Sequence, residues 1–157
     1  MTLDAEVQRP IAQFLATPPY HACLVVVHLE VERLQTAVAA IQGHYRWPTL
    51  AISQVLSQEV QAVAPRRRPS LAARALSRAI HAHAPGPLLC TDVTLLFEPV
   101  LHLDPLRLFL DAGRQTQLVV AWPGSSGNGV LAYATSAHAH YRTWPLAELC
   151  DYCVIIL

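Results

Sequence analysis

The chain has 157 residues, of which 53% are hydrophobic and 14% are charged. A domain of this length buries about 70% of its unfolded surface, and so apolar a composition excludes an intrinsically disordered chain. Eleven arginines balance eleven acidic residues, and there is no lysine. No run reaches the roughly 18 apolar residues of a membrane helix, and the acidic start of the chain is unlike a signal peptide. We therefore expect one cytoplasmic domain over residues 1–157, and the apolar excess favours self-association.

Helix and strand patterns alternate along the first half of the chain. Val7, Ile11 and Phe14 have helical spacing, but Pro10 predicts that this first helix is short or kinked. The apolar run 22–27 is typical of a strand that is buried on both faces of a parallel sheet. The next expected elements are a helix from residue 31 that stops at Gly43, a strand at 49–52, a helix from the N-cap Ser53 to about residue 64, and a helix after the N-cap Ser70.

The second half continues the alternation. Residues 85–87 (Pro-Gly-Pro) predict a turn before a buried strand at 88–93, and Asp104 and Gly113 mark the start and end of a helix. A strand at 118–122, a loop at 123–129, a return strand at 130–134 and a terminal strand at 154–157 follow. The sequence thus predicts an α/β fold: a mostly parallel sheet with helices on both faces, laid out like a P-loop NTPase, and a C-terminal β-hairpin.

The first strand-to-helix turn is the expected ligand site, because such sheets bind ligands at the carboxyl ends of their strands. A phosphate loop would need glycines at His28 and Arg33, lysine at Leu34, and serine or threonine at Gln35. None of these is present, and two glutamates in the same turn would repel a triphosphate. We expect a degenerate nucleotide site, with no cofactor, no metal and no catalytic residue, so the chain is not expected to be an enzyme.

Asp92 is the only acidic residue in the strand pattern at 88–97. It is either the remnant of a carboxylate that held magnesium or a strand-end aspartate that caps a turn. The absence of a phosphate loop favours the capping role.

A basic segment is the strongest local charge signal, since no acidic residue lies between Glu59 and Asp92. Its members are Arg66, Arg67, Arg68, Arg74 and Arg78. On a helix, Arg74 and Arg78 are neighbours four residues apart, and His81 continues their face. The segment is either a site for phosphates or for an acidic protein surface, or a solvated helix face.

Four cysteines lie inside or beside apolar runs: Cys23, Cys90, Cys150 and Cys153. This placement is typical of buried thiols in a reducing cytoplasm rather than of a disulfide framework. Cys150-x-x-Cys153 has the spacing of half a zinc site that His138 and His140 could complete. The apolar tail after it favours a buried terminal strand instead.

A family resemblance appears in the C-terminal half. It rests on residues 96–99 (LFEP), 103–108 (LDPLRL), 118–124 (LVVAWPG), 131–134 (LAYA) and His138-x-x-Tyr141-Arg142. Over residues 88–142 the chain resembles the BrxF-like proteins, small P-loop-type components of bacterial BREX (bacteriophage exclusion) defence systems. Members of that family carry a phosphate loop after the first strand, from which this chain departs. The resemblance therefore implies membership of a defence complex rather than nucleotide binding.

Trp122, His138, Tyr141 and Arg142 form a second candidate surface, because Trp, Tyr and Arg are the residues that anchor protein interfaces. The alternative is that Trp122 and Tyr141 are core residues covered by the stem of Arg142. We expect a non-catalytic subunit of an antiphage complex that acts through other defence proteins and as a homo- or hetero-oligomer. A nucleic-acid-binding module that uses the segment 66–78, or a divergent NTPase completed by a partner subunit, are the alternatives.

Overall fold

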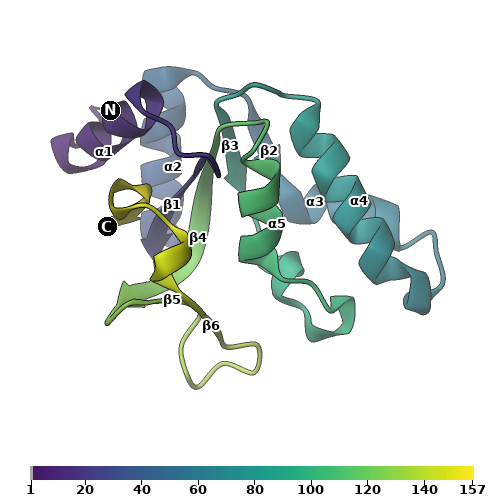
Figure 1. The fold of residues 1–157 in the computed structure, drawn as a ribbon. Helices are drawn as coiled ribbons and strands as arrows, with labels where there is room; N and C mark the ends of the chain where they lie inside the picture. Colours follow the sequence, from purple (N-terminus) through teal and green to yellow (C-terminus); the bar gives the residue numbers. More distant parts are fainter. Residues whose placement is uncertain (1) are drawn as a thin grey trace.

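Five parallel strands form the centre of the molecule (Figure 1). The computed structural model describes residues 2–157. Across the sheet the strands follow the order β2-β3-β4-β1-β7. Their bounds are β1 Cys23–His28, β2 Thr49–Ala51, β3 Leu88–Thr91, β4 Leu118–Gly127 and β7 Val154–Ile156. Residues 23–27 of β1 are all buried, as expected for a strand that helices cover on both faces. The predicted α/β class and the mostly parallel sheet are confirmed.

Two layers of helices cover the sheet (Figure 1). One face carries α1 (Ala5–Ala16) and α2 (Val31–Tyr45), which pack with Leu24 and Val26 of β1. The other face carries α3 (Ile52–Val60), α4 (Arg68–His81) and α5 (Pro105–Ala112), which pack with Val25 and Val27. Alternate residues of one strand thus supply two separate cores. No helix within residues 2–157 is long and apolar enough to cross a lipid bilayer.

Several helix ends differ from the prediction. The first helix is not short: α1 has 12 residues, continues through Pro10, and is capped by Asp4, whose side chain accepts a hydrogen bond from Glu6 N–H. Gly43 lies inside α2, which ends at a left-handed Arg46. These differences have one cause: tertiary packing of an apolar face holds a helix together through residues of poor helix propensity.

Neither predicted serine caps its helix. Ser53 lies inside α3, and its hydroxyl accepts a hydrogen bond from Leu95 N–H at 3.0 Å. Ser70 lies inside α4, which begins at Arg68. The Asp104 cap is confirmed, because its side chain accepts from Arg107 N–H at 3.1 Å and α5 ends next to Gly113.

The loop predicted at 123–129 is wrong, because β4 runs on to Gly127 and pairs antiparallel with β5 (Val130–Tyr133). The expected hairpin is present, and a strand that the sequence did not indicate, β6 (Arg142–Pro145), pairs with β5. A Cβ atom at Gly124 would overlap the carbonyl oxygen of Ala132, so only glycine lets the two strands approach here.

Candidate functional site

The turn from β1 to α2 contains no loop that could surround a phosphate. Only Leu29 and Glu30 separate the two elements. Glu30 N–H donates a hydrogen bond to His28 Nδ1 at 2.8 Å, and Arg33 Nε lies 3.5 Å from the Glu30 carboxylate in an exposed ion pair. The Glu30 amide and the Arg33 guanidinium are therefore both engaged in contacts within this turn.

The rest of the predicted nucleotide site lines a cavity of about 760 Å³. Its walls are one side of α2, the start of β2, the middle of β4, and the end of β3 with the residues that follow it. The cavity brings together Leu34, Gln35 and Asp92, whereas His28 and Arg33 are not among its lining residues. A cavity thus lies at the carboxyl end of the parallel sheet, where α/β proteins bind ligands, and its lining within residues 2–157 contains no cationic side chain.

Asp92 lies just beyond β3 in the left-handed backbone region, with φ of 51°. Its backbone carbonyl, not its carboxylate, accepts a hydrogen bond from Ser53 N–H at 2.7 Å. Within residues 2–157 the carboxylate has no hydrogen bond or ion pair. The side chain therefore does not cap a turn, which corrects the interpretation that the sequence favoured.

The arginine surface comprises Arg66, Arg67, Arg68, Arg74 and Arg78. Arg66 and Arg67 lie in a 3₁₀ turn, Pro65–Arg67, that leads directly into α4. Arg68 is half-buried and its Nε donates to the Val63 carbonyl at 3.3 Å, while the other four side chains are exposed. In the part of the chain that the structure describes, none of the five has a carboxylate within 4.0 Å.

Helical geometry gathers these charges on one line. Arg67, Arg74, Arg78 and His81 recur at spacings of seven, four and three residues, so they share the outer side of α4. The opposite side is buried through Ala72, Ala75, Leu76 and Ile80. The predicted basic face is confirmed as a surface, and its arginines project away from the core.

The second predicted surface divides between core and exterior. Trp122 is fully buried and donates its indole N–H to the Ala132 carbonyl at 3.0 Å, so its assignment to an interface is wrong. It packs in an aromatic cluster with Phe97 and Trp144. The sequence predicted the hairpin of β4 and β5 but not the added strand β6, which carries Trp144 onto Trp122. Trp144 was missed because β6 is too short to show an alternating pattern.

The remaining members of that surface lie outside this cluster. His138 is exposed, and Tyr141 is 41% exposed. Arg142 is half-buried: it donates to the Leu103 carbonyl at 2.7 Å, and its guanidinium lies 4.9 Å from the Trp144 ring centre. Arg142 therefore covers an aromatic residue, but it does so with its guanidinium group, and that residue is Trp144 rather than Trp122 or Tyr141.

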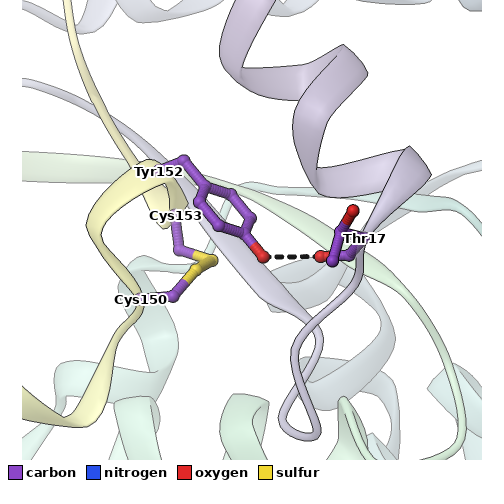
Figure 2. Close-up of a disulfide and its surroundings, with 4 residues drawn as sticks. All are labelled: Thr17, Cys150, Tyr152 and Cys153. Atoms are coloured by element: carbon purple, nitrogen blue, oxygen red, sulfur yellow. Dashed lines mark hydrogen bonds between the residues drawn. A yellow bond between two sulfur atoms is a disulfide. The ribbon is translucent and has the colours of Figure 1, made fainter.

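The C-terminal cysteines form a disulfide (Figure 2). The predicted buried thiols at Cys150 and Cys153 are wrong, because a 3₁₀ turn brings their Cα atoms to 5.1 Å, within the span of a disulfide. Tyr152, between them, donates its hydroxyl hydrogen to the Thr17 carbonyl at 2.5 Å and so joins this turn to the end of α1. Both sulfur atoms are bonded, so neither is a free metal ligand. The buried thiols at Cys23 and Cys90 are confirmed.

Histidines and carboxylates offer no alternative metal centre: within residues 2–157, no three His, Cys, Asp or Glu side chains gather closely enough to hold an ion. Burial raises the pKa of the Cys23 thiol from 9.0 to about 12, and burial likewise raises the pKa of Cys90. Both thiols are therefore poor nucleophiles at neutral pH.

Comparisons with models of protein families, with curated proteins and with solved structures find no match for this chain.

Proposed function

We propose that this protein is a non-catalytic subunit that docks on an acidic surface of a partner protein through the arginine surface of α4. The observation that carries the proposal is the absence of any carboxylate partner for those five arginines within residues 2–157. The resemblance over residues 88–142 suggests the setting, an antiphage complex of the BREX type.

Two other exposed arginines, Arg33 and Arg107, do have carboxylate partners. Arg107 lies 3.0 Å from the carboxylate of Glu148 and 4.0 Å from that of Asp111, and Arg33 is paired with Glu30. Arg9, Arg46 and Arg114 are exposed without a carboxylate of the described residues within 4.0 Å as well, but they are scattered over the chain. The arginine surface differs from them because its five unpaired arginines are gathered in the one segment 66–78. Guanidinium groups bind carboxylates in a planar, two-pronged geometry, which makes arginine well suited to an acidic protein surface.

The length of the arginine surface favours a protein partner over a nucleic acid. From Arg67 to His81 it extends about 21 Å along one helix. A duplex would meet a single line of charge here, whereas non-specific DNA-binding proteins spread their contacts over a wider positive track. A balanced chain with no net charge offers no such track.

The turn after β1 supports a role without nucleotide hydrolysis. It holds an ion pair and a buried leucine, Leu34, where a phosphate loop needs a lysine. A thermal shift titration tests this part. A nucleotide at a hundredfold over its Kd adds about 2.7 kcal/mol of stability. We expect no magnesium-dependent rise in Tm at millimolar ATP or GTP, and a clear rise would contradict the non-catalytic role.

The docking experiment uses the proteins encoded beside this gene as prey. The double variant Arg74→Ala/Arg78→Ala is compared with wild type and with Arg9→Ala/Arg114→Ala, a control pair of exposed arginines outside α4 that likewise have no carboxylate within 4.0 Å in the described part of the chain. We expect the first variant to lose affinity for an acidic neighbour by about tenfold or more, and the control to retain it. Equal capture by all three proteins would refute docking through α4.

The affinity for duplex DNA, measured over a series of salt concentrations, distinguishes the nucleic-acid alternative from protein docking. Five phosphate contacts would give a log–log slope of about −4 to −5, reduced by about two in the double variant. That result, without capture of a protein, would assign the arginine surface to DNA instead.

A further inference from the structure

The cavity beside α2 is an open groove with a buried floor: Leu34, Val93 and Ala121 are buried, while Asp92 and most other lining residues are exposed. Its volume of about 760 Å³ lies within the range of small-molecule sites. Four segments contribute to its walls: α2, the start of β2, the residues after β3, and β4. It lies at the carboxyl end of β3 and at the end of the parallel part of β4, the place where ligands meet open α/β sheets.

Most of the wall is apolar. The aliphatic side chains that line it are Val31, Leu34, Val38, Ala39, Val93 and Ala121, together with the ring of Pro123. Polar groups enter only at intervals, from Gln35 and Gln42 of α2 and from Thr49, Thr91 and Thr94. A ligand of this pocket therefore needs an apolar body with few polar groups.

The charge of the wall comes from a single residue. Asp92 is the one ionisable side chain that lines the cavity, and its carboxylate has no partner within residues 2–157. The carbonyl of the same residue is held by Ser53 N–H, which fixes the backbone beside the cavity. Thr91 and Thr94 place hydroxyl groups on either side of it in the sequence. A carboxylate accepts hydrogen bonds from a cation and repels a phosphate, and nearby hydroxyl groups of the same groove can accept further hydrogen bonds.

We propose that this pocket binds a small organic cation: an amine with an apolar body, its ammonium group on Asp92 and its body between α2 and β4. The ammonium group donates three hydrogen bonds, which the Asp92 carboxylate and the threonine hydroxyls of the groove can accept. The selectivity of the cleft is thus the reverse of that of a nucleotide site. This proposal is independent of the docking role of α4, because the two surfaces share no residue.

Three probes of matched shape test the proposal: 4-phenylbutylamine, 4-phenylbutan-1-ol and 4-phenylbutyrate. Each is titrated into the ¹⁵N-labelled full chain and followed by amide chemical shifts. We expect the amine to bind on the order of fivefold more tightly than the alcohol, and the carboxylate to bind most weakly. Saturable shifts should map to α2 and to residues 91–94.

Asp92→Asn isolates the charge. Asparagine adopts the left-handed backbone as readily as aspartate, so the variant keeps the φ of 51° and should fold as wild type. We expect the amine and the alcohol to bind within twofold of one another in this variant.

Ala39→Leu tests the pocket itself, since it adds bulk to an exposed helical position that lines the cavity. It should weaken the amine and the alcohol alike, while Ala12→Leu on the exposed side of α1 should leave both unchanged. The proposal is overturned if wild type binds the amine and the alcohol equally, if Asp92→Asn retains the preference for the amine, or if the shifts map to other residues. It is also overturned if no probe saturates the shifts at 10 mM, because a ligand with a binding free energy of about −4 kcal/mol has a Kd of roughly 1 mM.

Discussion

The two faces of the sheet both bury closed apolar cores, but they differ in what they display above those cores. The face under α3, α4 and α5 holds a dense core with Leu76, Ile80 and Phe109 almost fully buried, and α4 presents unpaired arginines above it. The face under α1 and α2 borders cavities of about 760 and 610 Å³ on the two sides of α2. The comparison suggests two kinds of binding: an outward-facing charged helix suits another macromolecule, and an open, largely apolar groove suits a small ligand.

Matched leucine truncations should give the largest difference between the two faces. Leu76→Ala on α4 removes a side chain that is 2% exposed and packed on all sides, so we expect a loss of about 3 kcal/mol in the free energy of unfolding. Leu34→Ala on α2 removes a leucine that already borders the cavity, and its fewer contacts predict a loss below about 2 kcal/mol. Urea denaturation measures both losses. Equal losses would show that the cavity under α2 is closed in solution.

Alkaline pH should destabilise the dense face. Burial raises the pKa of Cys23 from 9.0 to about 12, so the folded chain keeps this proton above pH 9 while the unfolded chain releases it. The stability that depends on Cys23 is complete below pH 9 and is lost towards pH 12, at up to about 1.4 kcal/mol per pH unit. Urea denaturation from pH 8 to 10.5 should therefore show a steeper decline for wild type than for Cys23→Ala.

The matched control is Cys150→Ala/Cys153→Ala, whose replaced sulfurs do not titrate in the disulfide. Burial also raises the pKa of Tyr133, and this contribution is common to all three proteins. A slope that is the same for wild type and Cys23→Ala would show that the thiol reaches solvent.

Reduction of the disulfide tests the other face, because Cys153 belongs to the core under α1 and α2. The bond closes a very short loop, so its chain-entropy contribution is at the lower end, about 1 to 2 kcal/mol. A reducing agent should lower the Tm of wild type and leave that of Cys150→Ala/Cys153→Ala unchanged. An effect on both proteins would assign the loss to something other than this bond.

The arginine surface should matter least for stability. Arg74 and Arg78 are exposed and have no ion pair within the described residues, and alanine is the better helix former. Arg74→Ala/Arg78→Ala should therefore change the free energy of unfolding by less than about 0.5 kcal/mol per site. If the double variant loses more than about 2 kcal/mol in the free energy of unfolding, measured by urea denaturation, these side chains stabilise the fold and are not a free binding surface.

Local sequence patterns determined the order of the main elements. The apolar run at 22–27 became β1, the turn at 85–87 precedes β3, and Asp104 and Gly113 bound α5. Each of these signals is complete within a few residues: two-sided burial in a strand, restricted backbone angles at proline, and a side chain that caps its own helix. The lack of phosphate-loop residues at His28, Arg33, Leu34 and Gln35 and the spacing of the arginines could be seen in the sequence for the same reason.

Tertiary structure decided what depends on residues far apart in the chain. Ser53 accepts a hydrogen bond from Leu95 N–H instead of capping its helix. Trp122 is buried under the β4–β5 hairpin and the strand β6 that pairs with β5, and β6 is too short to show a recognisable sequence pattern. The Cys150–Cys153 disulfide formed because a turn set the two Cα atoms at the right distance, which spacing alone left open to a metal site. The cavity beside Asp92 has no sequence signal, because an unfilled volume results from how α2 and the sheet pack together rather than from any one residue.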